Sequence, residues 1–464
     1  MKNFTKQALA IIAIAAFAVT GCKKGSEGNF DRSTGAGGPF DDADSVITGN
    51  ITASRTLSPN IVYRLKGVVY VTNGAKLTIK PGTIITSGDA VTYKVDPALP
   101  ATNSIAGVLV ITKNGSIDAV GTPAKPIIFT TPNDVGSRTA GNFGGVIILG
   151  ESTTNKATTQ EIEGLPKYDA AGAPLGVDIS YGGGIPADNS GRFQYVRIEY
   201  AGYKLAENNE VNGLTLGGVG SGTLVDHVQV SYGADDAFEF FGGTVNASYL
   251  LAVSNDDDDF DTDFGYRGTI QYAVGLKDPS STHSLSGTAA DSNGIESDND
   301  ATGSTTTTRT KPTYLNLTLL GYGSGPASTL RAGNRWRRNS DLSISNSIIA
   351  GYDSGAQFES TTTITSAAGF TNNLLHAYTT PSTTTLAASN TLSTSATPAS
   401  FILLGGTTAA PLNPFYTTAT RATYTMSNLL ARTDNTKGAV IASNFSNWNS
   451  GWVSFNFQDR YDFY

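Results

Sequence analysis

The side chains with the clearest capacity for chemistry lie between Asn255 and Asp263, where aspartate fills six of nine positions. Carboxylates at this density repel one another unless water solvates them or a cation bridges them. Calcium takes six to eight oxygen ligands and suits such a segment. In an extended chain alternate side chains share a face, which would place Asp257, Asp259, Asp261 and Asp263 on one side and Asp256 and Asp258 on the other.

Two further acidic groups accompany this run. Asp235 precedes Asp258 by 23 residues, and a third group follows between Asp291 and Asp300. If the chain coils with a period of about that length, the groups stack side by side. The predicted calcium ligands are Asp235, Asp236, Asp257, Asp258, Asp259, Asp261, Asp263, Glu296 and Asp298.

The acidic pattern also permits a structural interpretation. Runs of aspartate are often solvated loops, and aspartate side chains bond to the backbone in turns. An EF-hand is excluded, because Gly265 comes one residue late and Ile270 stands where that motif requires glutamate. A calcium site and a solvated or turn-forming run are therefore both retained as hypotheses.

A basic cluster surrounds Trp336 and consists of Arg331, Arg335, Arg337 and Arg338. One hypothesis is a site for an anionic sugar or a partner, formed by Trp336, Arg335 and Arg337, with the indole as a stacking platform. The other hypothesis pairs the arginines with the acidic segments inside the molecule. Charged residues make up only 15% of the chain, so local neutralisation fits the pattern at least as well.

These side chains need a scaffold, and the sequence predicts one made of strands. Short β-branched runs recur, each closed by glycine, asparagine or aspartate, as at 67–71, 107–111, 224–230, 269–274 and 342–349. The chain contains 52 glycines, and no helical spacing after the first residues extends beyond two turns. Val228, Leu251 and Tyr272 follow one another at intervals of 23 and 21 residues. This period indicates a solenoid in which short strands stack coil on coil.

Three segments carry a family resemblance: Leu77–Thr83, Gly115–Thr130 and Gly144–Gly150. They resemble coils of bacterial right-handed β-helix surface proteins. The C-terminal stretch Asn447–Phe457 resembles the end of a group of Bacteroidota cell-surface lipoproteins of unassigned function. The resemblance implies an all-β, right-handed parallel β-helix with loop insertions and a C-terminal capping segment over the open end. The expected insertions are 90–105, 152–191 and 275–311, with loops or irregular strands at 359–400.

Right-handed β-helices also include pectate lyases and polygalacturonases, so an enzyme is an alternative. Lyases of this shape use calcium on carboxylates and an arginine base, and here Arg267 or Arg331 would serve. The polygalacturonase pattern needs a histidine between glycines, which His227, His283 and His376 do not provide. We expect a non-enzymatic protein that binds a ligand, with a polysaccharide lyase or a structural envelope-assembly protein as alternatives.

The N-terminus predicts the location. Lys2 and Lys6 precede an apolar run over 8–19, which is too short to span a bilayer and fits a signal peptide. The run ends at Gly21 and Cys22, the only cysteine, and resembles the bacterial lipobox, which implies cleavage before Cys22 and lipidation of its thiol. Lys23 and Lys24 follow, so resemblance to the common sorting rule favours the outer membrane.

The predicted organisation is a signal peptide over 1–21, a lipidated Cys22 with a flexible tether to residue 45, a β-helix domain over 46–400 and C-terminal coils with a cap over 401–464. The formal net charge is −8 and would become −10 without the two leader lysines. This charge disfavours nucleic acid and anionic lipid as partners. The expected partners are the membrane, through the N-terminal lipid, and a glycan or an envelope protein at the cell surface.

Overall fold

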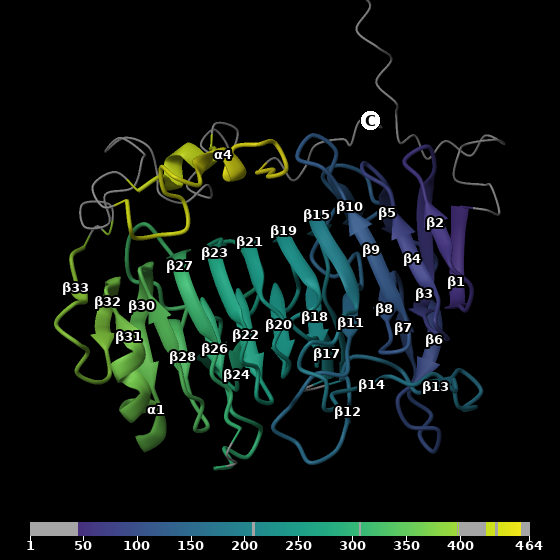
Figure 1. Ribbon diagram of the computed structural model, residues 1–464, viewed down its shortest axis with the longest axis horizontal. Helices are drawn as coiled ribbons and strands as arrows, with labels where there is room; N and C mark the ends of the chain where they lie inside the picture. Colours follow the sequence, from purple (N-terminus) through teal and green to yellow (C-terminus); the bar gives the residue numbers. More distant parts are fainter. Residues whose placement is uncertain are drawn as a thin grey trace, which may run out of the picture.

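The computed structural model describes residues 45–206, 209–305, 308–396, 398, 424–431 and 435–455. The predicted leader, Cys22 and tether lie outside these residues. The described chain winds into a parallel β-helix, in which each coil pairs in parallel with the next through one continuous sheet (Figure 1). This confirms the predicted fold class.

The sheet has three faces, which the chain visits in turn along each coil. The first face begins with β2 (Arg55–Leu57), β4 (Lys76–Ile79) and β9 (Ser116–Val120). It continues through the first halves of five long strands, β15 (Gly191–Glu199), β19 (Leu224–Ser231), β21 (Ala247–Val253), β23 (Thr269–Leu276) and β27 (Thr313–Leu320). It ends with β29 (Ser343–Ser345) and β31 (Phe370–Thr371).

The second face contains the other halves of those five strands. It also contains the start of β3 (Val62–Val71), then β5 (Ile84–Ser87), β10 (Ile127–Thr130), the start of β30 (Ile348–Phe358), β32 (Leu374–Ser382) and β33 (Thr391–Ser393). β1 (Val46–Ile51) pairs along β3 and starts the solenoid.

The third face runs from the end of β3 to the end of β30. Between them lie β8 (Val108–Ile111), β11 (Gly145–Leu149), β18 (Leu214–Gly217), β20 (Phe238–Phe241), β22 (Phe260–Asp263), β26 (Ile295–Ser297) and β28 (Ala332–Trp336).

A backbone corner separates the first face from the second. Its residues share a φ between 51° and 58°, and they are Tyr195, His227, Tyr249, Tyr272, Asn316, Asn346 and Asn372. Asparagine tolerates this left-handed conformation better than aromatic residues do. In the middle coils ring stacking accompanies it, because the His227 ring lies 4.5 Å from that of Tyr195 and 4.4 Å from that of Tyr249.

The core consists of inward-pointing rows that continue from coil to coil. On the third face Leu214, Phe238, Phe260 and Ile295 occupy matching positions in successive coils, and all four are fully buried. The rings of Phe238 and Phe260 stack with their centroids 5.5 Å apart. Burial of such rows provides the main stabilisation in a chain with a single cysteine.

Parts of the expected insertions form small antiparallel sheets beside the coils, with β6 (Val91–Lys94), β7 (Asn103–Ile105), β12 (Gln160–Glu161), β13 (Tyr168–Asp169), β14 (Ser180–Tyr181), β24 (Leu285–Ser286) and β25 (Ala289–Ala290). The expected insertion 275–311 also contains β26, which belongs to the third face, and a further insertion that was not expected contains β16 (Tyr203–Ala206) and β17 (Asn209–Val211). The segment after residue 359 differs from the expected loops, because Ser360 caps a short helix, α1 (Thr361–Ser366), which η2 (Ala367–Gly369) follows. Among the described residues no helix is long and apolar enough to cross a membrane.

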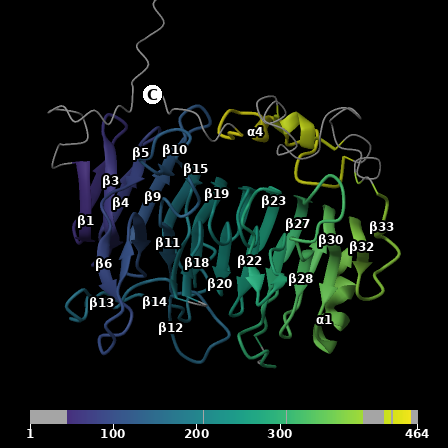
Figure 2. The same ribbon diagram turned by 180° about the vertical axis from the view of Figure 1, so that it is seen from behind.

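The C-terminal cover, as we call residues 424–431 and 435–455, includes η4 (Met426–Leu429) and α4 (Phe445–Trp448). Its apolar side chains pack on outward residues of the second face, including Leu251, Val274 and Ile348. Figures 1 and 2 show it lying along the solenoid rather than across the β33 end. The expected cap over the open end is therefore wrong for the described part of this segment, because its apolar side chains pack on the outward apolar residues of the second face.

Candidate functional site

The acidic residues meet on the outward side of the third face. The strand register aligns, coil after coil, the outward residues Thr215, Glu239, Asp261, Glu296, Arg335 and Gln357. Successive coils are 4.7–4.9 Å apart in a parallel ladder, so three carboxylates in this row face one another directly. We call Glu239, Asp261 and Glu296, together with Asp235, Asp236, Asp257 and Asp258 from the bends before these strands, the acidic row.

The bends before the strands bring more carboxylates to the row. Three groups have one carboxylate oxygen from each member within 4.8 Å of the others, and they are Asp235, Asp236 and Asp257; Asp236, Glu239 and Asp261; and Asp258, Asp261 and Glu296. The groups share Asp236 and Asp261, so they form a continuous line across three coils. Buried acidic clusters of this kind can hold a metal ion.

Backbone donors fix the bend that carries Asp258. The Asp258 N–H donates to Asp236 Oδ1 at 2.8 Å, and the Asn293 N–H donates to Asp258 Oδ1 at 2.5 Å. Each bond joins one coil to the next, so the carboxylates of three coils are positioned by the fold itself. This preorganisation lowers the cost of gathering oxygens around an ion.

The row is electrostatically unfavourable without a counter-charge. Burial, and then the charge of Asp258, raises the pKa of Glu296 to about 8. Burial raises the pKa of Asp261 well above its usual value, and Glu296 is the next cause. Burial followed by Asp257 does the same to the pKa of Asp258. At neutral pH these groups therefore need either protons or a bound cation.

Two oxygens at the row accept no hydrogen bond within the described structure. Oδ1 of Asp261 is buried without a donor, and so is Oδ1 of Asn293. Asn293 is fully buried, and its Nδ2 lies 3.4 Å from Glu296 Oε2, so the amide belongs to the group of Asp258, Asp261 and Glu296. Buried acceptors normally have a partner, and oxygens without one suit a hard cation.

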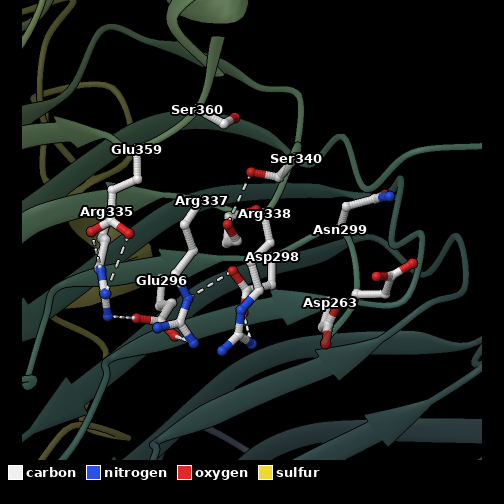
Figure 3. Close-up of polar contacts among 12 residues, drawn as sticks. Asp263, Glu296, Asp298, Asn299, Arg335, Arg337, Arg338, Ser340, Glu359 and Ser360 are labelled. Carbon is white, nitrogen blue, oxygen red and sulfur yellow. Dashed lines mark hydrogen bonds and ion pairs between the residues drawn. The ribbon is translucent and has the colours of Figure 1, made fainter. Parts of the chain in front are cut away.

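Arginines end the row at the next coil, as Figure 3 shows. Arg335 Nη1 lies 2.7 Å from Glu296 Oε2 and its Nε lies 2.8 Å from Glu359 Oε1. Arg337 Nη2 lies 2.5 Å from Glu296 Oε1 and its Nε lies 2.7 Å from Asp298 Oδ1. Burial opposes the charge of Arg337, but Glu296 and Asp298 outweigh it and hold its pKa above the usual value.

This pairing decides between the two hypotheses for the basic cluster. Arg335 and Arg337 form internal ion pairs, and Trp336 is fully buried with its ring 6.0 Å from that of Tyr314. The expectation that Trp336 is an exposed stacking platform is wrong, because residues alternate along β28 and this one points into the core between Ser297 and Phe358.

The structure brings together most of the predicted ligands. Asp235, Asp236, Asp257, Asp258, Asp261 and Glu296 all belong to the three groups. Asp263 and Asp298 lie on the same face, two residues after Asp261 and Glu296. Burial, and then the charge of Asp298, raises the pKa of Asp263. Asp298 pairs with Arg337 and Arg338.

Asp259 is the exception among the predicted ligands. It points inward, with its Oδ1 3.4 Å from Lys277 Nζ, and both side chains are fully buried. The predicted alternation over 257–263 is wrong, because the strand begins only at Phe260 and the preceding residues form a bend. Asp258 consequently shares a group with Asp261 instead of pointing away from it.

Sequence reasoning missed three acidic residues near the row: Glu239, Glu163 and Glu210. Glu239 precedes Asp261 by the 22 residues that also separate Asp236 from Asp258, and this repeated offset was a usable signal. Glu163 lies in an insertion, and burial, followed by the charge of Glu210, raises its pKa to about 8. No spacing rule could have located it.

The arginines proposed as lyase bases do not suit that role. Arg331 Nη1 lies 3.0 Å from Asp291 Oδ1 and its Nη2 lies 2.9 Å from Glu359 Oε1. Arg267 is exposed and donates to the backbone oxygen of Arg309. Arg331 is therefore held in two ion pairs and Arg267 by a backbone oxygen, so both guanidinium groups are already engaged within the protein.

Comparison with known proteins gives one match. The family described as "Pectate-lyase like beta helix domain" matches residues 49–453, which covers most of the chain. No curated protein and no solved structure matches.

Proposed function

The chain belongs to the pectate-lyase-like β-helix domain family, and on this premise we propose that it is a lipid-anchored protein of the outer-membrane surface that binds calcium on the acidic row and uses the stiffened β-helix to bind a glycan or an envelope protein without catalysis. One observation carries the calcium part. Asp258, Asp261 and Glu296 present oxygens within 4.8 Å of one another from two successive coils.

The choice of calcium rests on the donors. All of them are oxygens, the carboxylates outnumber any local cation, and the unpaired Oδ1 of Asn293 adds a neutral ligand. Calcium accepts irregular sets of six to eight oxygens, whereas magnesium demands near-octahedral geometry and retains its water. A set of carboxylates from neighbouring coils, with irregular geometry, fits the larger ion.

Isothermal titration of the metal-free protein with CaCl2 and with MgCl2 tests this part. We expect heat from calcium uptake in the wild type, and an affinity at least tenfold weaker, about 1.4 kcal/mol, in Asp258→Asn/Asp261→Asn. Asp118→Asn is the matched control, because Asp118 pairs with Arg192 on the first face. Absence of calcium uptake by the folded wild type, or equal affinity of the double variant, overturns the proposal.

The anchor is proposed from the sequence around Cys22. Growth with an alkyne-labelled fatty acid should label the wild type and leave Cys22→Ser unlabelled and released from the membrane fraction. Protease treatment of intact cells tests whether the protein is exposed on the cell surface. A Cys22→Ser protein that stays in the membrane contradicts the anchor.

A polysaccharide lyase is the alternative that the family description favours. The carboxylate-paired Arg331, Arg335 and Arg337 argue against an arginine base. Incubation with polyuronates in the presence of calcium, followed by absorbance of unsaturated products, separates the two functions. A pull-down that recovers a membrane β-barrel and no glycan would instead favour an envelope-assembly role.

A further inference from the structure

A lysine and an aspartate meet inside the solenoid with no exposure to solvent. Lys277 directly follows β23, and Asp259 directly precedes β22. Lys277 Nζ lies 3.4 Å from Asp259 Oδ1, and both side chains are 0% exposed. Neither oxygen of Asp259 accepts a hydrogen bond within the described structure. In an ion pair this deep, a carboxylate whose oxygens accept no hydrogen bond leaves much of the desolvation cost of the charges uncompensated.

The surroundings hold the two groups against each other. A Cβ atom at Gly275 would collide with Asp259 Oδ2, so the missing side chain of this glycine makes room for the carboxyl group. Lys277 Nζ donates to the backbone oxygen of Asp257, which keeps the nitrogen beside Asp259. The Tyr352 hydroxyl is also buried without a hydrogen bond, and after burial the charge of Asp259 is the next cause of its raised pKa.

We propose that Lys277 and Asp259 condense to form an intramolecular isopeptide bond. Within the pair, the ammonium first transfers one proton to the carboxylate, which gives an amine and a carboxylic acid. The amine lone pair then attacks Asp259 Cγ, so the Nζ–Cγ bond forms and a Cγ–O bond breaks. The departing hydroxyl takes a second proton from the nitrogen and leaves as water. The reaction consumes no oxidant, reductant or cofactor.

The product satisfies the groups that the ion pair leaves unpaired. An amide has no net charge, so the desolvation penalty of two ions disappears. Its N–H retains the bond to the Asp257 oxygen, and the buried Tyr352 hydroxyl, which has no hydrogen-bond partner in the described structure, is an available donor for its carbonyl oxygen. The new bond ties the bend that carries the acidic row to the neighbouring strand β23. This inference does not depend on whether calcium binds.

Tryptic peptide mapping of the full-length protein under denaturing conditions tests the bond. Without it, trypsin releases residues 205–267, 268–277 and 278–309 as separate peptides. With it, trypsin cannot cleave after Lys277. Peptide 268–277 is then absent, and a branched species joins 205–267 to 268–309 with a mass one water molecule below their sum. Fragmentation should locate the link at Asp259 and Lys277.

Two comparisons make the result specific. Lys277→Met and Asp259→Ala should lack the branched species and the loss of water. The pair Lys113 and Asp178 has a shorter separation of 3.2 Å and should remain unlinked, because its carboxylate is exposed and water solvates it. Recovery of peptide 268–277 from the wild type in the same yield as its neighbours overturns the proposal, and it does so even if neither variant folds.

Discussion

The second and third faces of the β-helix have the same coil geometry but differ in their outward residues, which are largely apolar on the second face and acidic on the third. On the second face Leu251, Val274, Thr318 and Ile348 align in register, and the C-terminal cover packs on the three apolar side chains and hydrogen-bonds to Thr318. On the third face Glu239, Asp261 and Glu296 align in the same way. These carboxylates are buried side by side, which is costly unless they take up protons or a cation supplies positive charge.

In a parallel β-helix, equivalent outward residues of successive coils lie side by side, so their chemical character is repeated along the face. An apolar residue repeated in every coil produces a stripe that needs a protein cover. A carboxylate repeated in every coil produces a line of like charges that needs cations. Arg335 and Arg337 supply positive charge at the end of the line, and we propose that calcium supplies it in the middle.

The largest predicted effect removes the apolar cover. Trp448 is fully buried between the cover and the second face, and its Nε1 donates to the Ala439 oxygen. Trp448→Ala should lower the free energy of unfolding by about 3–5 kcal/mol, the usual cost of deleting a buried tryptophan. Chemical denaturation with calcium present measures this loss. Leu224→Ala at an exposed site should change stability by less than about 0.5 kcal/mol, and equal losses in both variants would contradict the assignment.

The next effect removes the arginine that ends the acidic row. Arg337→Gln leaves Glu296 and Asp298 without their short contacts to this guanidinium. In EDTA we expect a loss of about 2 kcal/mol, since two charged hydrogen bonds are lost while Arg335 still pairs with Glu296 and Arg338 with Asp298. Calcium should recover part of this loss, because it can neutralise Glu296. Thermal melting in EDTA and in calcium gives both values, and an equal loss in the two buffers would count against a cation at the row.

The pH dependence sharpens the contrast between protons and cations. The pKa of Glu296 rises from 4.5 to about 8 on folding, through burial and the charge of Asp258. Between these values the folded chain holds a proton that the unfolded chain has released. Metal-free stability is therefore greatest below about pH 4.5 with respect to this group and falls as the pH rises toward 8.

Melting curves from pH 5 to pH 8 in EDTA should accordingly show a decreasing transition temperature. Saturating calcium should flatten the decrease, because the cation replaces the proton. A transition temperature that increases over this range in EDTA would contradict the raised pKa of the row. The Trp448→Ala protein should show the same calcium-sensitive decrease, since Trp448 packs on the second face and not on the acidic row.

The smallest effect separates the two roles of Asp261. In EDTA, Asp261→Asn replaces a carboxyl group that folding forces to take up a proton with a neutral amide, and it should raise stability by about 1 kcal/mol. In calcium the same variant should be less stable than the wild type, because a ligand is lost. Asp118→Asn should shift stability by less than about 1 kcal/mol in both buffers. An Asp261→Asn protein that is destabilised equally in EDTA and in calcium would assign this residue a purely structural role.

The sequence predicts the solenoid because its evidence is local. β-Branched runs and turn residues repeat in each coil, and the interval from Asp235 to Asp258 differs by one from the 22-residue register that aligns Phe238 with Phe260. The same interval places the acidic groups side by side. A repeat length is a property of the sequence alone, so it can be recognised without knowing the three-dimensional structure.

What the sequence could not provide is the direction of single side chains and the packing of the chain end. Asp259 points inward because a bend precedes Phe260, and a run of identical residues carries no mark of where a bend stops. Trp336 lies in a basic segment, yet the register of β28 turns it to the core. The cover contacts coils more than two hundred positions away, as in the bond from Gln229 to the Ser454 oxygen, and no local pattern encodes that contact.

The long reach of the C-terminal cover also sets an order of events in folding. Each coil needs only contacts between residues about one coil apart, so coils can form one after another as the chain emerges. The apolar stripe on the second face stays open until residues 435–455 become available. A nearly complete solenoid thus passes through a stage in which it is prone to association, and its last segment ends that stage.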